Sequence, residues 1–271
     1  MKQIEEIVRQ SFSVQAENFE SPAMSFSKQE YLQETLKAVG ANKTDLALEV
    51  AAGTCACGRA LADQVQHVVC LDLTPAMLAE GKKEAERQGK TNMTFLLGNA
   101  MELPFLPDSF DLVISRLAFH HFPDVRRPMQ EMARVLKPGG KLVLIDMEAA
   151  EEYLRQTEDE IETLRDASHV KNLSREEMLH LFEEEKIEVE QCTSTKIPVS
   201  LDAWMQLTKT PQNVQSEIQK RMREELEGGA KTGCSPYQAG GSIRFDQRWL
   251  FLLGRKPRQE KTIDYKSIVG K

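Results

Sequence analysis

The sequence lacks the features that would place the protein in a membrane or in the extracellular space. No uninterrupted apolar run reaches the ~18 residues of a membrane span, and the N-terminus, Met-Lys-Gln-Ile-Glu-Glu, has acidic residues where a secretory signal has its apolar core. The five cysteines are odd in number and lack paired C-x-x-C spacing, which argues against a disulfide framework or a zinc site. We therefore expect a cytoplasmic protein with no metal site and no stable membrane insertion.

An excess of positive charge is also missing. The chain has 35 Lys and Arg against 42 Asp and Glu, for a formal net charge of −7, so we expect no general attraction to the phosphates of nucleic acids. What the chain does have is a globular composition, with 41% hydrophobic and 28% charged residues. Its 271 residues are enough for one large domain with a substantial core.

Short β-rich segments alternate with longer amphipathic segments in the first half of the chain. This pattern is typical of β-α-β units on a parallel sheet. The expected strands cover residues 46–50, 68–72, 93–97, 110–115 and 141–146, with two more at about 187–197 and 248–253. The expected helices cover residues 59–66, 75–89 and 125–136, with one or two more within 201–226. Thr74 and Pro75 predict a helix start, and residues 137–140, Lys-Pro-Gly-Gly, predict a helix end followed by a turn.

Four segments that could bind a ligand come directly after predicted strands, where the crevice of an open parallel sheet lies. A run of small residues, 51–58, follows the first strand. Asp72 follows the second, 19 positions beyond Gly53, which is near the ~20-residue spacing at which a strand-end carboxylate reaches a ribose diol. The other two segments are Asn99-Ala100-Met101 and residues 116–124. Because Cys55 occupies the second glycine position of G-x-G-x-x-G, the loop is poorly suited to a dinucleotide pyrophosphate.

Six motifs in order between residues 49 and 140 resemble those of class I S-adenosylmethionine-dependent methyltransferases, most of all the ubiquinone and menaquinone biosynthesis branch. The motifs are residues 49–58, 71–78, 98–105, 108–113, 120–124 and 135–140. Each motif alone is weak, but the ordered set is specific. The resemblance covers residues 40–150 firmly and the later strands loosely. S-adenosylmethionine contains ribose and adenine but no phosphate, so it needs less room in the loop around Cys55 than a dinucleotide does. The family usually has glycine at the position of Cys55.

The resemblance implies methyl transfer from S-adenosylmethionine, by in-line displacement, to a small-molecule acceptor. Asp72 would accept hydrogen bonds from the ribose hydroxyls. The residues implied at the methionine end of the cofactor are Ala51, Gly53, Thr54 and Arg116, and those implied around its adenine are Leu73, Met77, Asn99, Ala100 and Met101.

The resemblance also implies an α/β, Rossmann-like fold: a seven-stranded, mostly parallel sheet with helices on both faces and a helical cover over the carboxyl-terminal strand ends. We expect an N-terminal arm with three phenylalanines, one domain made of a cofactor-binding half and a cover with the last two strands, and a polar tail. The corresponding ranges are 1–30 with Phe12, Phe19 and Phe26, then 31–256 divided into 40–150 and 151–256, and 257–271. The acidic triplets at 158–160 and 183–185 are interpreted as solvated helix faces.

His121 and His169 are the candidate general bases. A base is needed if the acceptor is a hydroxyl or an amine, whereas an electron-rich ring carbon needs little help. The alternative for His121 is a packing or capping role, and for His169 an interaction with a helix terminus. Cys55 and Cys57 are interpreted as small packing residues. We expect the arm with Phe12 and Phe19 to close over the site.

Two other functions remain open at this point. One is a protein that binds S-adenosylmethionine without turnover, which Cys55 supports. The other is an NAD-dependent oxidoreductase, which the missing glycines and the absence of a catalytic Tyr or Lys motif weaken. Neither the acceptor nor the oligomeric state follows from the sequence.

Overall fold

The computed structural model describes residues 2–20 and 29–258, and its described residues form one eight-stranded sheet. The strands are β1 (Leu46–Val50), β2 (His67–Asp72), β3 (Met93–Leu97), β4 (Phe110–Arg116), β5 (Leu136–Met147), β6 (Glu188–Ser200), β7 (Tyr237–Ala239) and β8 (Ser242–Arg255). Their order is β3-β2-β1-β4-β5-β8-β6, with β7 paired to β8. Strands β1 to β5 are parallel, and β8 lies antiparallel between β5 and β6.

This order creates a ligand crevice between β1 and β4. The chain moves outward from β1 to β3 and then returns to the other side of β1 to form β4, so the crossover helices diverge at that point. The mostly parallel α/β fold predicted from the sequence is confirmed, with β7 as an additional short strand.

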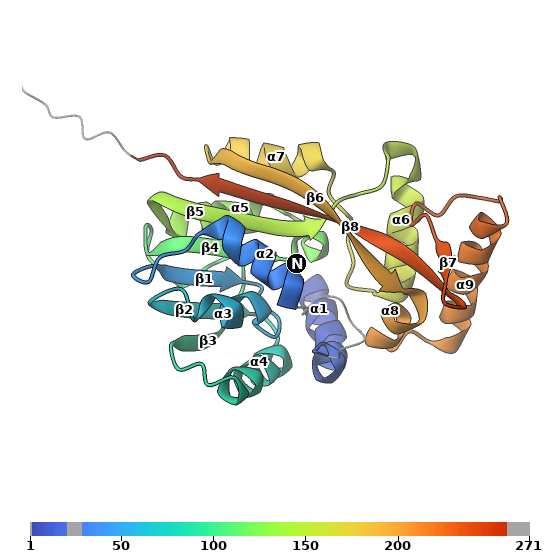
Figure 1. Ribbon diagram of the computed structural model, residues 1–271, viewed down its shortest axis with the longest axis horizontal. Helices are drawn as coiled ribbons and strands as arrows, with labels where there is room; N and C mark the ends of the chain where they lie inside the picture. The colour runs from blue at the N-terminus through green and yellow to red at the C-terminus, as the bar shows by residue number, and fades with distance from the viewer. Residues whose placement is uncertain (1, 21–28, 259–271) are drawn as a thin grey trace, which may run out of the picture.

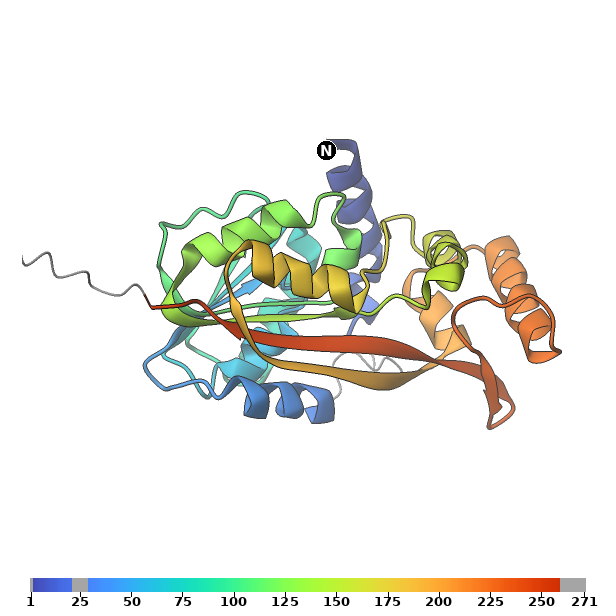
Figure 2. The same ribbon diagram turned by 90° about the horizontal axis from the view of Figure 1, so that it is seen from above.

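Helices cover both faces of the sheet, as Figure 2 shows with α5 and α7 above it and α2 below. The helices are α1 (Lys2–Gln15), α2 (Gln29–Val39), α3 (Ala56–Leu61), α4 (Pro75–Arg87), α5 (Arg126–Val135), α6 (Glu152–Arg165), α7 (Arg175–Glu184), α8 (Leu201–Leu207) and α9 (Gln212–Leu226). Consecutive residues of β4 point to opposite faces: Ile114 packs in a core with Leu61 of α3, and Val113 in a core with Met132 of α5. No described helix is long and apolar enough to cross a bilayer.

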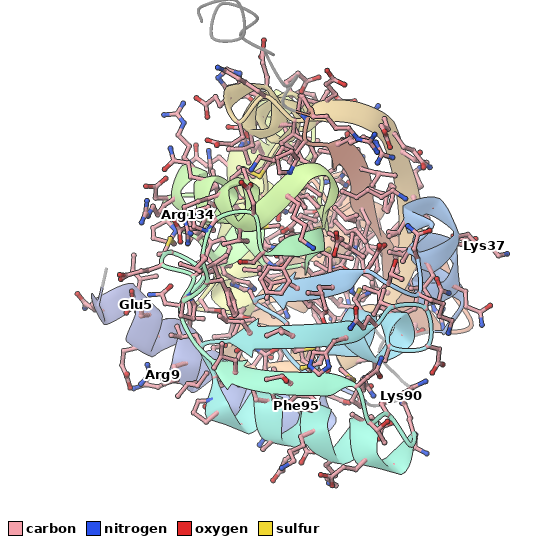
Figure 3. The ribbon with its side chains drawn as sticks, turned by 90° about the vertical axis from the view of Figure 1, so that its left-hand side faces the viewer. Glu5, Arg9, Lys37, Lys90, Phe95 and Arg134 are labelled. Carbon is pink, nitrogen blue, oxygen red and sulfur yellow. The ribbon has the colours of Figure 1, made fainter. Side chains whose placement is uncertain are left out.

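Strands β6 and β8 extend beyond the ends of the other strands, and α6, α8 and α9 gather around this extension (Figure 1). A third core, which includes Trp204, Ile218 and Phe245, joins these elements. Helix α1 lies beside the carboxyl ends of the parallel strands in Figure 1. From another side, Figure 3 shows α1, with Glu5 and Arg9, on the opposite side of the strands from α2, with Lys37.

Several local predictions need correction. Helix α5 ends at Val135, one residue before the predicted end, and the predicted turn at 137–140 is part of β5. Its backbone bonds with a distant segment, since Gly139 N donates to Lys256 O at 2.7 Å and Lys256 N to Gly140 O at 3.0 Å. Helix α3 spans Ala56–Leu61 instead of 59–66, because the turn after β1 is complete at Cys55.

The cover also differs from expectation. The triplet at 158–160 is not a fully solvated face, because Glu158 is buried and pairs with Arg248 of β8. The predicted last strand, 248–253, is the centre of the longer β8. Phe26, and the polar tail beyond Arg258, lie outside the described residues.

Candidate active site

A cavity lies at the carboxyl ends of β1, β2 and β4. It brings together most of the side chains that the sequence predicted for the cofactor. The predicted residues that line it are Ala51, Gly53, Thr54, Asp72, Leu73, Asn99, Ala100, Arg116 and the candidate base His121. We call it the cofactor cavity.

The loop between β1 and α3 forms the floor of the cofactor cavity and is built from left-handed backbone. Ala51, Gly53 and Cys55 have φ values of +52°, +53° and +61°. Glycine adopts this region without strain, whereas residues with a Cβ do so at a cost. A Cβ on Gly81 of α4 would lie 2.8 Å from the carbonyl oxygen of Thr54, so α4 packs directly against this loop because Gly81 has no side chain.

Asp72 joins the loop to the start of α4. Its Oδ2 accepts a hydrogen bond from Gly53 N at 2.7 Å, and its Oδ1 accepts one from Thr74 N at 2.7 Å. Burial raises the pKa of this carboxyl, and the backbone donors oppose that rise. Thr74 is the N-cap of α4 and Pro75 its first residue, as predicted, but the Thr74 side chain makes no capping bond.

Helix α1 and the segment after it close the cofactor cavity from above. Val8, Phe12 and Phe19 line it. Polar contacts hold this cover at both ends: Asn99 Nδ2 donates to Glu5 Oε1 at 3.0 Å, and the Thr54 hydroxyl donates to the Glu20 carboxylate.

A second, smaller cavity, here called the inner chamber, adjoins the first. Four residues line both cavities: Phe12, Phe19, Leu117 and His121. The inner chamber extends from this shared wall toward the cover, where Met147, Leu207, Gln247, Arg165 and Asp166 complete its lining together with Gln15 and His120.

His121 lies in the shared wall, on the short 3-10 helix Phe119–His121 (η2) that follows β4. Its Nδ1 is 3.0 Å from the carbonyl oxygen of Ser168. A carbonyl oxygen can only accept, so Nδ1 carries the proton and Nε2 keeps a lone pair. Burial, and then the charge of His120, lower the pKa of His121 to about 3, which keeps the ring neutral.

His120 forms a buried ion pair with Asp146 at the end of β5. Asp146 Oδ2 also accepts from Phe119 N at 2.6 Å, so this carboxylate holds η2 in place. Burial opposes the charged form of His120, but the carboxylate outweighs it and raises the pKa of His120. Burial likewise opposes the charged form of Asp146, and His120 lowers the pKa of Asp146 below its ordinary value.

The other predicted site residues lie apart. In the part of the chain that the structure describes, Met77, Met101 and His169 line neither cavity. Met101 N donates to Asn99 Oδ1 at 3.0 Å and so orients a residue that does. The His169 side chain is fully buried, with Nε2 2.8 Å from Asp159 Oδ1.

Several residues of the site were not predicted. Asp146 follows the same rule that identified Asp72, an acid at the end of a parallel strand, and could have been found that way. Glu5, Val8 and Gln247 come from segments that carry no ligand-binding motif, and only the tertiary fold brings them to the cavities.

The lining of the cofactor cavity fits an adenosyl sulfonium ligand. Two carboxyl groups, of Glu49 and Asp72, and one guanidinium, of Arg116, line it, and the remaining lining is small, apolar or uncharged polar. Arg116 is the one Lys or Arg among its described lining residues. A pyrophosphate needs more positive charge or free loop amides, so a dinucleotide fits poorly. No group of described His, Cys, Asp and Glu residues could hold a metal ion.

Comparison with known proteins agrees with this geometry. Residues 48–144 match the family model described as a methyltransferase domain. The uncharacterized methyltransferase YcgJ of Bacillus subtilis is 30% identical over 247 residues, covering 90% of this chain and 97% of the relative. A demethylmenaquinone methyltransferase of Listeria welshimeri is 37% identical over 117 residues, covering 42% of this chain and 50% of the relative.

Solved structures show the same fold. The crystal structure of the Bacillus YcgJ protein matches with a TM-score of 0.76 and 27% identity, over 84% of this chain and 99% of that one. A phosphoethanolamine N-methyltransferase from Haemonchus contortus, solved with S-adenosylhomocysteine, matches with a TM-score of 0.59 and 19% identity, over 85% and 53% of the two chains. The near full-length relationship to YcgJ, together with the matched domain, shows that the chain belongs to the S-adenosylmethionine-dependent methyltransferases.

Proposed function

We propose that the cofactor cavity binds S-adenosylmethionine and that the inner chamber binds a small-molecule methyl acceptor. The observation that carries this proposal is the wall of four residues that the two cavities share. Ligands in the two cavities would both contact these four residues, and an in-line displacement requires such closeness of donor and acceptor. S-adenosylmethionine supplies the electrophilic methyl group, on a sulfonium sulfur.

We assign the cofactor contacts as follows. Asp72 accepts hydrogen bonds from the ribose hydroxyls, and Asn99 hydrogen-bonds to the edge of the adenine. Residues 51–54 and Arg116 hold the methionine end. Helix α1 covers this ligand, so its residues exclude water from the reacting groups.

His121 is the residue we place at the acceptor. Its neutral ring and free Nε2 lone pair suit it to accept a hydrogen bond from an acceptor hydroxyl or amine and so to orient the nucleophile. A pKa of about 3 makes it a weak base, so for His121 to take the proton its pKa must rise when the acceptor binds. His169 lines neither cavity, so we give it a supporting role in the cover.

The inner chamber supports a small and largely apolar acceptor. Phe12, Phe19, Leu117, Met147 and Leu207 make up its apolar lining. The acidic composition of the chain likewise disfavours a nucleic acid as acceptor.

Calorimetric titration with S-adenosylmethionine, S-adenosylhomocysteine and NAD tests the cofactor. Saturable binding of the two adenosyl ligands without NAD is the expected result. Binding of NAD alone, or of none, would refute the assignment. Tight binding with no methyl transfer to any acceptor of a broad panel would instead favour the non-catalytic alternative.

Replacing Asp72 tests the ribose contact. Asp72→Ala removes a charge-assisted hydrogen bond worth ~1.5 to 3 kcal/mol, so affinity for S-adenosylhomocysteine should fall about tenfold or more. Asp63→Ala is the control, since Asp63 is exposed and pairs only with Lys90 among described cations. Equal affinities in the two variants would show that Asp72 does not bind the ribose.

A further inference from the structure

Arg165, the last residue of α6, is a buried cation with unused hydrogen-bond donors. Its side chain is 7% exposed, and it lines the inner chamber but not the cofactor cavity. Trp204 covers one face of the guanidinium, with Cζ 4.5 Å from the ring centroid, and Nη2 donates to Glu162 Oε2 at 3.1 Å. Its Nε and Nη1 make no hydrogen bond with a described residue. Buried donors without an acceptor are costly, and an oxygen atom of a bound molecule would remove part of that cost.

Gln247 of β8 supplies a second donor to the same chamber. It is buried, and its Oε1 accepts a hydrogen bond from Trp249 Nε1 at 3.3 Å. Because an indole N–H can only donate, this bond fixes the amide orientation, and the amide nitrogen lies 3.3 Å from Met147 Sδ. A thioether sulfur is a weak acceptor, and Met147 also lines the inner chamber. The Gln247 amide can therefore exchange this weak contact for a hydrogen bond to an oxygen of a bound molecule.

The charges around the inner chamber decide whether that oxygen is anionic or neutral. Each cation that lines the chamber already has a carboxylate: Glu162 pairs with Arg165, and Asp146 pairs with His120. Asp166 lines the chamber as a third carboxylate; burial opposes its charge, but nearby groups, Arg165 first, lower its pKa below the ordinary value. Two cations thus face three carboxylates, so a carboxylate on the ligand would lack a counter-ion. An ammonium group can only donate and would meet two further donors, which leaves an uncharged carbonyl oxygen as the group that fits.

We propose that Arg165 and Gln247 determine acceptor specificity by donating hydrogen bonds to an uncharged carbonyl oxygen of the methyl acceptor. This inference rests on the role proposed for the inner chamber as the acceptor site. Both residues line the inner chamber outside the shared wall, so the carbonyl group lies toward the cover and the nucleophile toward His121. The apolar lining contacts the body of the molecule between these two ends. The substrate class is therefore a small neutral molecule with a carbonyl group at one end and the methylated atom at the other.

Four one-ring probes of similar size test the chemistry of this oxygen. Acetophenone carries a carbonyl group, ethylbenzene no polar group, benzoate a carboxylate and benzylamine an ammonium group. Each probe is titrated into the full chain; ligand-detected NMR gives its affinity, and the side-chain amide signal of Gln247 reports where it binds. Gln247→Met lacks this signal and so assigns it. Acetophenone should bind about fivefold or more tightly than each of the other three, as expected for one added hydrogen bond, and should shift the Gln247 signal most.

Variants of the two donors separate a specific role from a structural one. Gln247→Met keeps the size of the side chain and removes its donor, so the affinity for acetophenone should fall about fivefold while that for ethylbenzene stays the same. Gln206→Met is the matched control, because Gln206 is exposed on α8. The double variant Arg165→Met/Glu162→Gln removes the guanidinium without leaving its partner charged, and should also lower the affinity for acetophenone alone. It decides the question if Gln247→Met does not fold.

A preference for acetophenone that the donor variants reduce, with Gln206→Met like the wild type, supports the inference. A preference for benzoate or benzylamine, an equal loss of acetophenone and ethylbenzene binding in the variants, or no shift at Gln247 with any probe would overturn it. The probes need no cofactor, so titration with S-adenosylhomocysteine separates the two proposals. Failure of the wild type to bind that ligand would refute the proposed cofactor, while the carbonyl preference of the chamber is measured independently.

Discussion

Cys55 combines a fully buried side chain with a backbone conformation that suits glycine. Its φ is +61°, and its exposed fraction is 0%. The methyltransferase motif that residues 49–58 resemble usually has glycine at this position, and a left-handed turn accounts for that preference. In this chain the buried thiol fills space beside α4, at the price of backbone strain.

A matched pair of substitutions measures that strain. Cys55→Gly and Cys55→Ala both remove the thiol, but only the alanine variant keeps a Cβ at positive φ. We expect Cys55→Gly to be more stable than Cys55→Ala by about 1 kcal/mol in urea unfolding. An alanine variant equal to or more stable than the glycine variant would show that the loop does not hold the left-handed conformation.

His121 gives the stability of the protein a specific dependence on pH. Its pKa is about 3 in the folded protein against an ordinary value of 6.5. Between these values the unfolded chain binds a proton that the folded chain does not, so the contribution of His121 to stability falls as the pH falls, by up to ~1.4 kcal/mol per pH unit. The free energy of unfolding of the wild type should therefore fall more than that of His121→Phe from pH 6 to pH 4. Denaturant unfolding at several pH values checks this, and a constant difference would contradict the lowered pKa.

At the scale of elements, α1 is the piece of the site that sequence patterns did not define. Residues 1–30 were expected to form an arm that closes over the site, and α1 does lie over the cofactor cavity. Its contacts, from Glu5 to Asn99 and from Ser11 to Asp166, join positions more than ninety residues apart. Local periodicity carries no information about such pairs.

Phe12 is the side chain of α1 best placed to test this cover. It lines both cavities, and its ring lies edge-on to the His121 ring, with 4.9 Å between the two ring centroids. Phe12→Ala removes part of the buried apolar wall, so binding of S-adenosylhomocysteine should weaken by roughly 1 kcal/mol, about fivefold. Val14→Ala, on the exposed side of the same helix, should bind like the wild type. Calorimetry compares them, and equal affinities would mean that α1 does not cover the bound ligand.

The strands of the cofactor half were predictable because their signals are local. Residues 46–50, 68–72 and 93–97 are short β-rich segments between amphipathic helices, and the structure places β1, β2 and β3 there. The turn predicted at 137–140 failed because Lys256 supplies backbone partners from the other end of the chain. Glu158 was misjudged for the same reason, since its partner, Arg248, lies 90 positions away.

That misjudged pair supports a prediction about the cover. Glu158 of α6 pairs with Arg248 of β8 and also accepts from Ala150 N at 2.7 Å. Glu158→Ala leaves both donors without their partner and should lower the free energy of unfolding by about 2 kcal/mol. Glu160→Ala is the control, because Glu160 is exposed on the same helix. Equal stabilities in thermal or urea unfolding would show that the buried pair does not hold α6 to the sheet.

For the whole molecule, the cofactor cavity draws on segments from Val8 to Phe122, so a bound ligand should stabilise the chain as a unit. A ligand at ~100 times its Kd adds ~2.7 kcal/mol to the folded state. For a chain of this size that corresponds to a rise in Tm of roughly 5 to 10 °C. Scanning calorimetry with S-adenosylhomocysteine should show this rise, while NAD should leave Tm unchanged. A Tm that responds equally to both would contradict the cofactor assignment.

The two halves of the molecule also differ in how far the sequence predicts their chemistry. The cofactor half brings together residues that follow consecutive parallel strands, so a motif search found Gly53, Asp72 and Asn99. The inner chamber takes Gln15, Asp166 and Gln247 from three distant segments. Its chemistry becomes visible only when the cover has folded onto the sheet.

The position of β8 between β5 and β6 has a consequence for how the protein is made. Strand β6 pairs with β8 and not with β5, yet it precedes β8 in the chain. During synthesis β6 therefore emerges from the ribosome before its partner exists, and the edge of β5 stays open for the same few seconds. Open strand edges can pair with other chains. The nascent cofactor half thus passes through an interval of exposure to aggregation and to chaperones, which ends when β8 inserts between its two neighbours.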